Sequence, residues 1–167
     1  MIELPRVTSH FLLVEDDPDQ IALVIRALDD IRSRIEPLIC HDGAEALESL
    51  RAAVARGPGH LPRFVLLDAT MPRVDGLQVL RKIRSDPATG DLPVVMFSSS
   101  TLVEDVERAY NLGVTAYCAK PISFSDFVHI LLAVLVQWGG HVMEAVHQWE
   151  HAILDRYFKG PHGLFSV

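Results

Sequence analysis

Hydrophobic and polar positions divide the chain into two kinds of segment that follow each other in turn. Five short apolar runs, rich in β-branched or aromatic residues, have the length of strands: residues 11–14, 35–40, 64–67, 94–97 and 115–118. Between them lie segments in which apolar residues recur every three or four positions, as the buried stripe of an amphipathic helix requires. The pattern therefore predicts that a helix follows each strand.

The predicted strands are apolar without strict alternation, which is typical of strands that are buried on both faces. A regular succession of strands and helices favours a parallel sheet with right-handed crossovers. We therefore predict an α/β fold, a doubly wound five-stranded parallel sheet. Because such sheets bind ligands at the carboxyl ends of their strands, the residues directly after each strand are the candidates for chemistry.

Capping signals mark the predicted helix starts. Asp17 precedes Pro18, which suits the first helical position, and Asp75 also reads as a cap or turn residue. Three pairs have the spacing of a capping box: Asp42 with Glu45, Thr101 with Glu104, and Ser123 with Asp126.

Composition narrows the possible partners. The 167 residues include 15 Lys and Arg against 22 Asp and Glu, a net charge of −7, so nucleic acid and membrane surfaces are both poor partners. The first residues lack a secretory signal, and the longest apolar stretch, residues 127–136, is too short to cross a bilayer. We therefore expect a cytoplasmic protein in which Cys40 and Cys118 are reduced and buried.

Polar residues follow four of the five predicted strands. They are Glu15, Asp16 and Asp17 after the first strand, Asp68 after the third, Ser98 after the fourth and Lys120 after the fifth. Carboxylates gathered at one sheet edge repel each other unless a cation lies among them. Mg²⁺ is the natural cation, with Asp16 and Asp68 as direct ligands and Glu15 reaching it through water. Lys120 and Ser98 would then contact an anion beside the metal.

These motifs, in this order and spacing, resemble the receiver domain of two-component response regulators. The matching segments are residues 13–18, 67–72 with Asp75-Gly76, 93–99 and 116–121. The resemblance implies a flavodoxin-like sheet of strand order 2-1-3-4-5. It also implies that the protein is a phosphoacceptor, which takes a phosphoryl group from a sensor histidine kinase and is not an enzyme beyond its own phosphotransfer and dephosphorylation.

Individual roles come from the same resemblance. Asp68 would be the phosphoacceptor, and the backbone carbonyl of Thr70 would be a metal ligand. Ser98 would bind a phosphoryl oxygen and, with the aromatic Tyr117, form a two-state switch. The Lys120–Pro121 bond would be cis. Ser99 and Ser100 read as loop residues, although Ser99 stands where the residue type affects access to the phosphoryl group.

The last residues predict an interface. We assign residues 8–138 to the receiver domain and 139–167 to a helical extension. Residues 127–138 are apolar almost all round, and a stripe in the extension repeats every three or four positions: Val142, Val146, Trp149, Ile153 and Tyr157. We expect a homodimer formed by the last receiver helix and the extension, the alternative being that the extension folds back on its own domain.

A narrower resemblance is to the small regulators associated with phytochrome-type kinases, carried by residues 15–18, 85–87, 110–113 and Trp138. It implies a sensor histidine kinase as partner, with a bacteriophytochrome as a candidate. Two other functions stay open. One is a phosphatase of the haloacid-dehalogenase type, which places its nucleophile after the first strand in an Asp-x-Asp motif. The other is a receiver-like dimerisation module whose phosphorylation is vestigial.

Overall fold

The structure is a computed structural model that describes residues 10–140 and 151–161. Its strands are β1 (His10–Val14), β2 (Glu36–Cys40), β3 (Val65–Asp68), β4 (Val94–Ser98), β5 (Ala116–Ala119) and β6 (Phe158–Lys159). Its helices are α1 (Pro18–Asp30), α2 (Gly43–Arg56), α3 (Gly76–Ser85), α4 (Val103–Asn111), α5 (Phe124–Gln137) and α6 (His151–Tyr157), with a 3₁₀ turn, η1 (Pro58–His60). Each of the five predicted strands is present, within one or two residues of its predicted bounds.

The strands form one sheet in the order β2-β1-β3-β4-β5-β6. The first five are parallel to their neighbours, which confirms the predicted parallel sheet and its order 2-1-3-4-5. The sixth, β6, is antiparallel to β5 and was not predicted. The sheet therefore ends on a strand from the extension.

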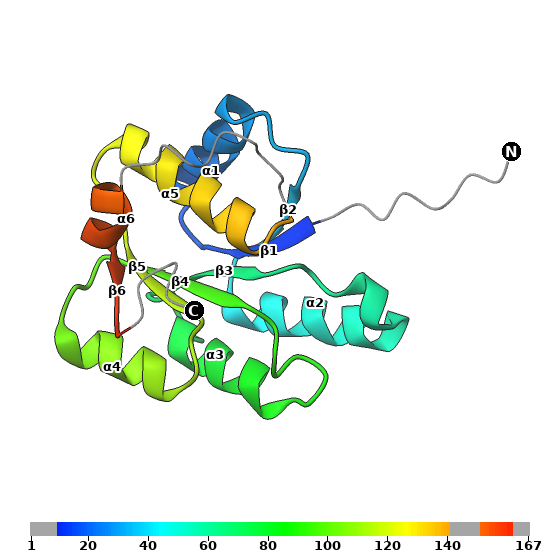
Figure 1. Cartoon of the computed structure of the whole chain (residues 1–167). Coiled ribbons are helices and arrows are strands. Elements are labelled where there is room, and N and C mark those ends of the chain that lie inside the picture. The colour runs from blue at the N-terminus through cyan, green and yellow to red at the C-terminus, as the bar shows by residue number, and fades with distance from the viewer. Residues whose placement is uncertain (1–9, 141–150, 162–167) are drawn as a thin grey trace, which may run out of the picture.

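Helices cover both faces of the sheet (Figure 1), with α1 and α5 on one face and α2, α3 and α4 on the other. Successive strand residues point to opposite faces: Phe11 and Leu13 pack with α1 and α5, whereas Leu12 and Val14 pack with α2 and α3. The two apolar layers hold the strands rigidly, and the strand ends form the edge that carries the acidic residues.

Most of the predicted helix caps are present. The side chains of Asp17, Asp42 and Ser123 each accept a hydrogen bond from a backbone N–H in the first turn of the helix that follows. Asp75 forms a complete capping box with Gln78 at the start of α3.

The predicted cap at Thr101 is wrong. The N-cap of α4 is Leu102, which makes no side-chain cap bond. Ser100 replaces it in part, because its hydroxyl accepts from the Leu102 N–H at 3.3 Å and donates to Asp105 at 2.5 Å.

The prediction of a cis Lys120–Pro121 bond is also wrong. Every peptide bond of the described residues is trans, this one included. The trans form is the lower-energy isomer of an X–Pro bond by about 0.5–1 kcal/mol.

The described part of the extension folds back on its own domain. Leu154 of α6 and Phe158 of β6 are buried in the apolar layer that contains α5, and Figure 1 shows α6 beside the start of α5. Part of the apolar surface of α5 is thus covered from within the chain. Val142, Val146 and Trp149 of the predicted stripe lie outside the described residues. No helix of the described part is long and apolar enough to cross a membrane.

Candidate functional site

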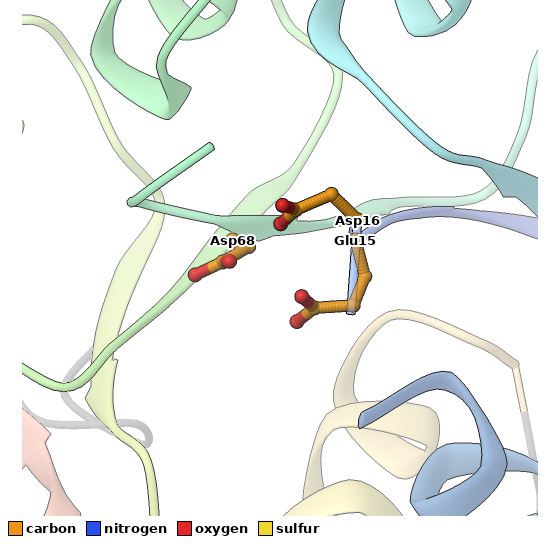
Figure 2. Close-up of side chains that lie close together, drawn as sticks. All are labelled: Glu15, Asp16 and Asp68. Carbon is orange, nitrogen blue, oxygen red and sulfur yellow. The ribbon is translucent and has the colours of Figure 1, made fainter. Parts of the chain in front are cut away.

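The predicted acidic residues meet at the carboxyl edge of the sheet. Glu15 and Asp16 directly follow β1, and Asp68 is the last residue of the neighbouring strand β3. One oxygen from each carboxylate lies within 4.8 Å of the other two, so a single cation could contact all three. Figure 2 shows the three side chains gathered in this way.

Lys120, just beyond β5, joins this cluster. Its Nζ lies 3.1 Å from a Glu15 oxygen and 3.2 Å from Asp68 Oδ1. Glu15 and Asp68 are buried, with 5% and 7% of their surface exposed, whereas Asp16 is exposed. The three carboxylates and one ammonium leave a formal charge of −2 when all are ionised.

The titration of the cluster reflects its crowding. Burial raises the pKa of Glu15, and the nearby charge of Asp68 raises it further, against the opposing effect of Lys120. For Lys120, burial lowers the pKa, but the charges of Asp68 and Glu15 and the hydrogen bonds to them outweigh burial, so the pKa is raised overall. Either protonation of Glu15 or a bound cation would reduce the repulsion among the carboxylates.

Close backbone packing holds the end of β3 against the start of α3. Gly76, at the start of α3, packs against the backbone at Asp68 and Ala69, where an added Cβ would collide with the Asp68 carbonyl oxygen. The Gly76 N–H donates to the Ala69 carbonyl at 3.1 Å. Only glycine allows α3 to begin this close to β3, which explains why a glycine follows the cap residue Asp75.

Thr70 lies beside the cluster through its backbone. Its N–H donates to Asp68 Oδ1 at 3.3 Å, and the N–H of Asp17 donates to Glu15 Oε1 at 3.2 Å. These two amides hold two of the three carboxylates. That the Thr70 carbonyl ligates a metal stays a prediction, since the structure records its N–H, and no contact of its carbonyl, at the cluster.

Ser98 at the end of β4 and Tyr117 in β5 are both buried, at 2% and 1% exposure. The Ser98 hydroxyl accepts from the Ser100 N–H at 3.0 Å, and the Tyr117 hydroxyl donates to the Ser100 carbonyl at 3.0 Å. Burial raises the pKa of the Tyr117 hydroxyl, so it is a neutral donor near neutral pH. Ser98 and Tyr117 therefore both bond the backbone of Ser100, one at its N–H and the other at its carbonyl.

Sequence reasoning missed the part played by Ser100. It accepts from Tyr117, donates to Asp105 of α4, and closes a turn on Ser98. The signal was a hydroxyl residue two positions after Ser98, followed five residues later by a carboxylate in the first turn of a helix. Gln20 of α1 was also missed, although it lines a cavity of about 20 Å³ together with Glu15, Asp68 and Lys120.

The donor set fits a hard divalent cation. All three acidic ligands offer oxygen, the local charge is negative, and no thiol or imidazole is among the three residues grouped at the cluster. Asp16, Asp68 and Glu15 would hold Mg²⁺. The arrangement places the buried Asp68 carboxylate beside two other carboxylates and a lysine.

Comparison with known proteins agrees with this geometry. The family model of the response regulator receiver domain matches residues 11–132. The chain belongs to the response regulator receiver family. Among curated relatives, the probable methanogenesis regulatory protein FilR2 of Methanothrix harundinacea is 39% identical over 131 residues, covering 77% of this chain and 83% of FilR2.

Two solved structures are similar along most of the chain. The phosphorylated cyanobacterial phytochrome response regulator RcpA is 31% identical with a TM-score of 0.71, covering 81% of this receiver chain and 96% of RcpA. The bacteriophytochrome response regulator AtBRR is 34% identical with a TM-score of 0.64, covering 83% of this chain and 98% of AtBRR. The structural relatives thus include regulators named after phytochromes.

Proposed function

We propose that this receiver is a response regulator that accepts a phosphoryl group on Asp68 in the presence of Mg²⁺. The observation that carries the proposal is the buried Asp68 carboxylate, which lies within reach of Glu15, Asp16 and Lys120 at one sheet edge. Carboxylates are known nucleophiles, and phosphoryl transfer depends mainly on positioning and on charge neutralisation.

The chemistry follows from the positions of the side chains. An Asp68 carboxylate oxygen attacks the phosphorus of a phosphohistidine, the P–N bond breaks, and its electron pair leaves with the imidazole nitrogen. The product is an acyl phosphate on Asp68. Bound Mg²⁺ supplies positive charge to the phosphoryl oxygens. Lys120 supplies a second positive charge, which it now shares between Asp68 and Glu15.

The remaining predicted roles are part of this proposal. Ser98 would donate its hydroxyl to a phosphoryl oxygen. With Mg²⁺ bound, Asp16 and Asp68 would be direct ligands, Thr70 would offer its carbonyl, and Glu15 would reach the metal through water. Tyr117 changes position with the loop after Ser98. The protein is then a signalling switch and not an enzyme with an external substrate.

The partner we propose is a sensor histidine kinase, and RcpA and AtBRR support a bacteriophytochrome as the kind of kinase to test first. Phosphotransfer from a panel of the host's histidine kinases, followed over time, identifies the cognate kinase as the one that transfers fastest. Equal rates from all kinases would contradict a dedicated phytochrome partner.

A homodimer through α5 and residues 139–167 is a further proposal. It is supported by the apolar α5, but α6 and β6 pack on their own domain, so the remainder of the extension would have to carry the interface. Solution mass of the full chain, and of a chain that ends at residue 138, tests it. A monomer in both cases contradicts the dimer.

Phosphoryl uptake tests the main proposal. Full-length protein with Mg²⁺ and acetyl phosphate should gain one phosphoryl group in an intact-mass spectrum, and Asp68→Asn should gain none. Asp75→Asn is the matched control, because it removes the same charge seven residues away and keeps a residue suited to the helix cap.

Uptake by Asp68→Asn equal to that of the unmodified protein would overturn the assignment of Asp68. A phosphatase would instead consume the donor through many turnovers without accumulating a phosphorylated form. A vestigial module would take up no phosphoryl group at all.

A further inference from the structure

The edge strand β5 is already occupied within the chain. Residues 151–161, here called the C-terminal strap, comprise α6, β6 and the turn that follows. In β6, Lys159 pairs with Tyr117 and Phe158 pairs with Cys118, antiparallel to β5. The strap therefore uses the backbone edge that would otherwise be open to a strand from another protein.

The strap is attached to α5 by packing and by one polar contact. Leu154 and Phe158 are buried, at 4% and 6% exposure, in the apolar layer that includes Phe127. The Tyr157 hydroxyl donates to Asp126 of α5 at 2.7 Å. The strap thus covers apolar surface as well as the strand edge.

The strap contacts α4 at Tyr110. The Tyr110 hydroxyl donates to the Lys159 carbonyl at 2.8 Å, and the Tyr110 ring lies against the backbone of Gly160. Gly160 has φ +128°, and a Cβ there would run into that ring. Elsewhere, an open groove of about 760 Å³ separates the strap from α4, lined by Val103, Val106 and Glu107 among others. The contact with α4 is therefore tight at Tyr110 and loose beyond it.

The same helix α4 is tied to the acidic site. Ser98 holds the Ser100 N–H, and the Ser100 hydroxyl donates to Asp105 in the first turn of α4. Tyr117 contacts both the loop after Ser98 and the strap. Its hydroxyl donates to the Ser100 carbonyl, and its backbone pairs with Lys159. Two routes, along α4 and along β5, thus connect Ser98 with the strap.

We propose that the C-terminal strap is an intramolecular occupant of the β5 edge and the α4–α5 surface, and that phosphorylation of Asp68 releases it. The proposal rests on the proposed function of Asp68. Once Ser98 turns its hydroxyl to a phosphoryl oxygen, the Ser100 N–H loses its present acceptor. The loop then moves and takes Asp105 and the start of α4 with it.

The tight contact at Gly160 converts this movement into release. Because the Tyr110 ring has no free space against the Gly160 backbone, a shift of α4 either pushes on the strap or breaks the Tyr110–Lys159 bond. The released state exposes the β5 edge and the apolar surface under Leu154 and Phe158 to a protein partner.

Amide hydrogen exchange on the full chain tests the proposal. With Mg²⁺ and acetyl phosphate, the amides of residues 151–161 should exchange faster by about 5- to 150-fold, the usual range of coupling between two sites. The amides of β1 and β3 should not change. Asp68→Asn under the same conditions should show no acceleration in the strap.

Two variants distinguish the loss of the strap contact from the general effect of replacing a glycine that has a positive φ. Gly160→Ala should release the strap without any phosphodonor, because its φ and the Tyr110 ring both oppose a side chain. Gly57→Ala is the matched control, since Gly57 also has a positive φ, +110°, but nothing lies within 4 Å of an added Cβ. Gly57→Ala should leave strap exchange unchanged.

Thermodynamic linkage requires the reverse effect as well. Gly160→Ala should bind beryllofluoride with Mg²⁺ more tightly than the unmodified protein does, by up to the factor by which that ligand favours strap release. Tyr110→Phe, the milder change, should show a smaller gain. Equal affinity in all three proteins would overturn the coupling.

The intact mass of each sample distinguishes the possible failures. Phosphoryl uptake with unchanged strap exchange overturns the strap proposal and leaves the proposed function standing. Absence of uptake overturns the proposed function itself. Faster strap exchange in Gly57→Ala equal to that in Gly160→Ala would show that the Tyr110 contact is not the fastening point.

Discussion

The acidic site and the C-terminal strap are built in opposite ways. Glu15, Asp68 and Lys120 come from distant parts of the sequence, but each stands at the end of a strand that is buried on both faces. The strap lies at one edge of the sheet, where a two-residue strand and a few side chains attach it. The site is held by the core of the domain, whereas the strap depends on its own contacts.

The two regions should therefore differ in the free energy that is needed to open them. Strands in the middle of a sheet open only when the whole domain unfolds, whereas an element at its edge can open locally at a lower free energy. A site that must keep its geometry benefits from the first arrangement. An element that moves requires the second.

The largest expected effect compares two buried leucines. Leu67 in β3 is fully buried next to Asp68, and Leu67→Ala should lower the free energy of global unfolding by about 2–5 kcal/mol. Leu154→Ala should cost no more than the free energy that docks the strap, because the strap can detach while the domain stays folded. Chemical denaturation measures both, and equal losses would contradict the separation of the two regions.

Mg²⁺ binding should stabilise the folded domain, and this gain in stability should not depend on the strap. At a Mg²⁺ concentration of about a hundred times its Kd, the free energy of unfolding should rise by about 2.7 kcal/mol. Asp16→Asn and Asp68→Asn should reduce this gain, since both remove carboxylates of the cluster. Phe158→Ala in the strap should retain it. Denaturation curves with and without Mg²⁺ give the comparison.

The pH dependence of stability should show the crowding of the carboxylates. Because the pKa of Glu15 in the folded protein lies above its ordinary 4.5, its contribution to stability is fully present below pH 4.5 and is lost as the pH rises through the raised pKa. Asp68→Asn removes one cause of that shift. Its denaturation midpoint should therefore fall less between about pH 4 and about pH 8 than the midpoint of the unmodified protein does. A steeper fall would contradict the assigned cause.

The smallest effect is expected at Tyr157. Tyr157→Phe removes the hydrogen bond to Asp126 and keeps the ring. Exchange of the strap amides should rise, while the denaturation midpoint of the domain should stay the same. A lower midpoint would mean that the strap is part of the global core.

The gathering of the acidic residues and Lys120 at one sheet edge was predictable because it follows from a general rule. Once Asp16, Asp68 and Lys120 are placed at the ends of parallel strands, they meet at one edge, whatever the details of packing. Asp17 and Ser123 were predictable as caps because a cap depends on residues within one helical turn. Periodicity and local chemistry were sufficient for these features.

The strap and the loop after Ser98 were not predictable in this way. Strand β6 has two residues, too few for a periodic signal, and its pairing with Tyr117 depends on contacts between residues more than forty positions apart. At α4, Thr101 and Glu104 satisfied the capping pattern, but the N-cap is Leu102, and the Ser100 hydroxyl bonds the Leu102 N–H and Asp105 instead. Long-range pairing decided the first case, and local hydrogen bonds of Ser100 that compete with the predicted cap decided the second.

Strand β6 also affects how the protein behaves in concentrated solution. An exposed edge strand can pair with other molecules and lead to aggregation. At the other edge of the sheet, Pro37 removes a backbone donor from β2, a common protection of edge strands. The β5 side has β6 in the equivalent role. A receiver fragment cut before residue 151 should therefore be less soluble than the full chain, even though it retains every residue of the acidic site.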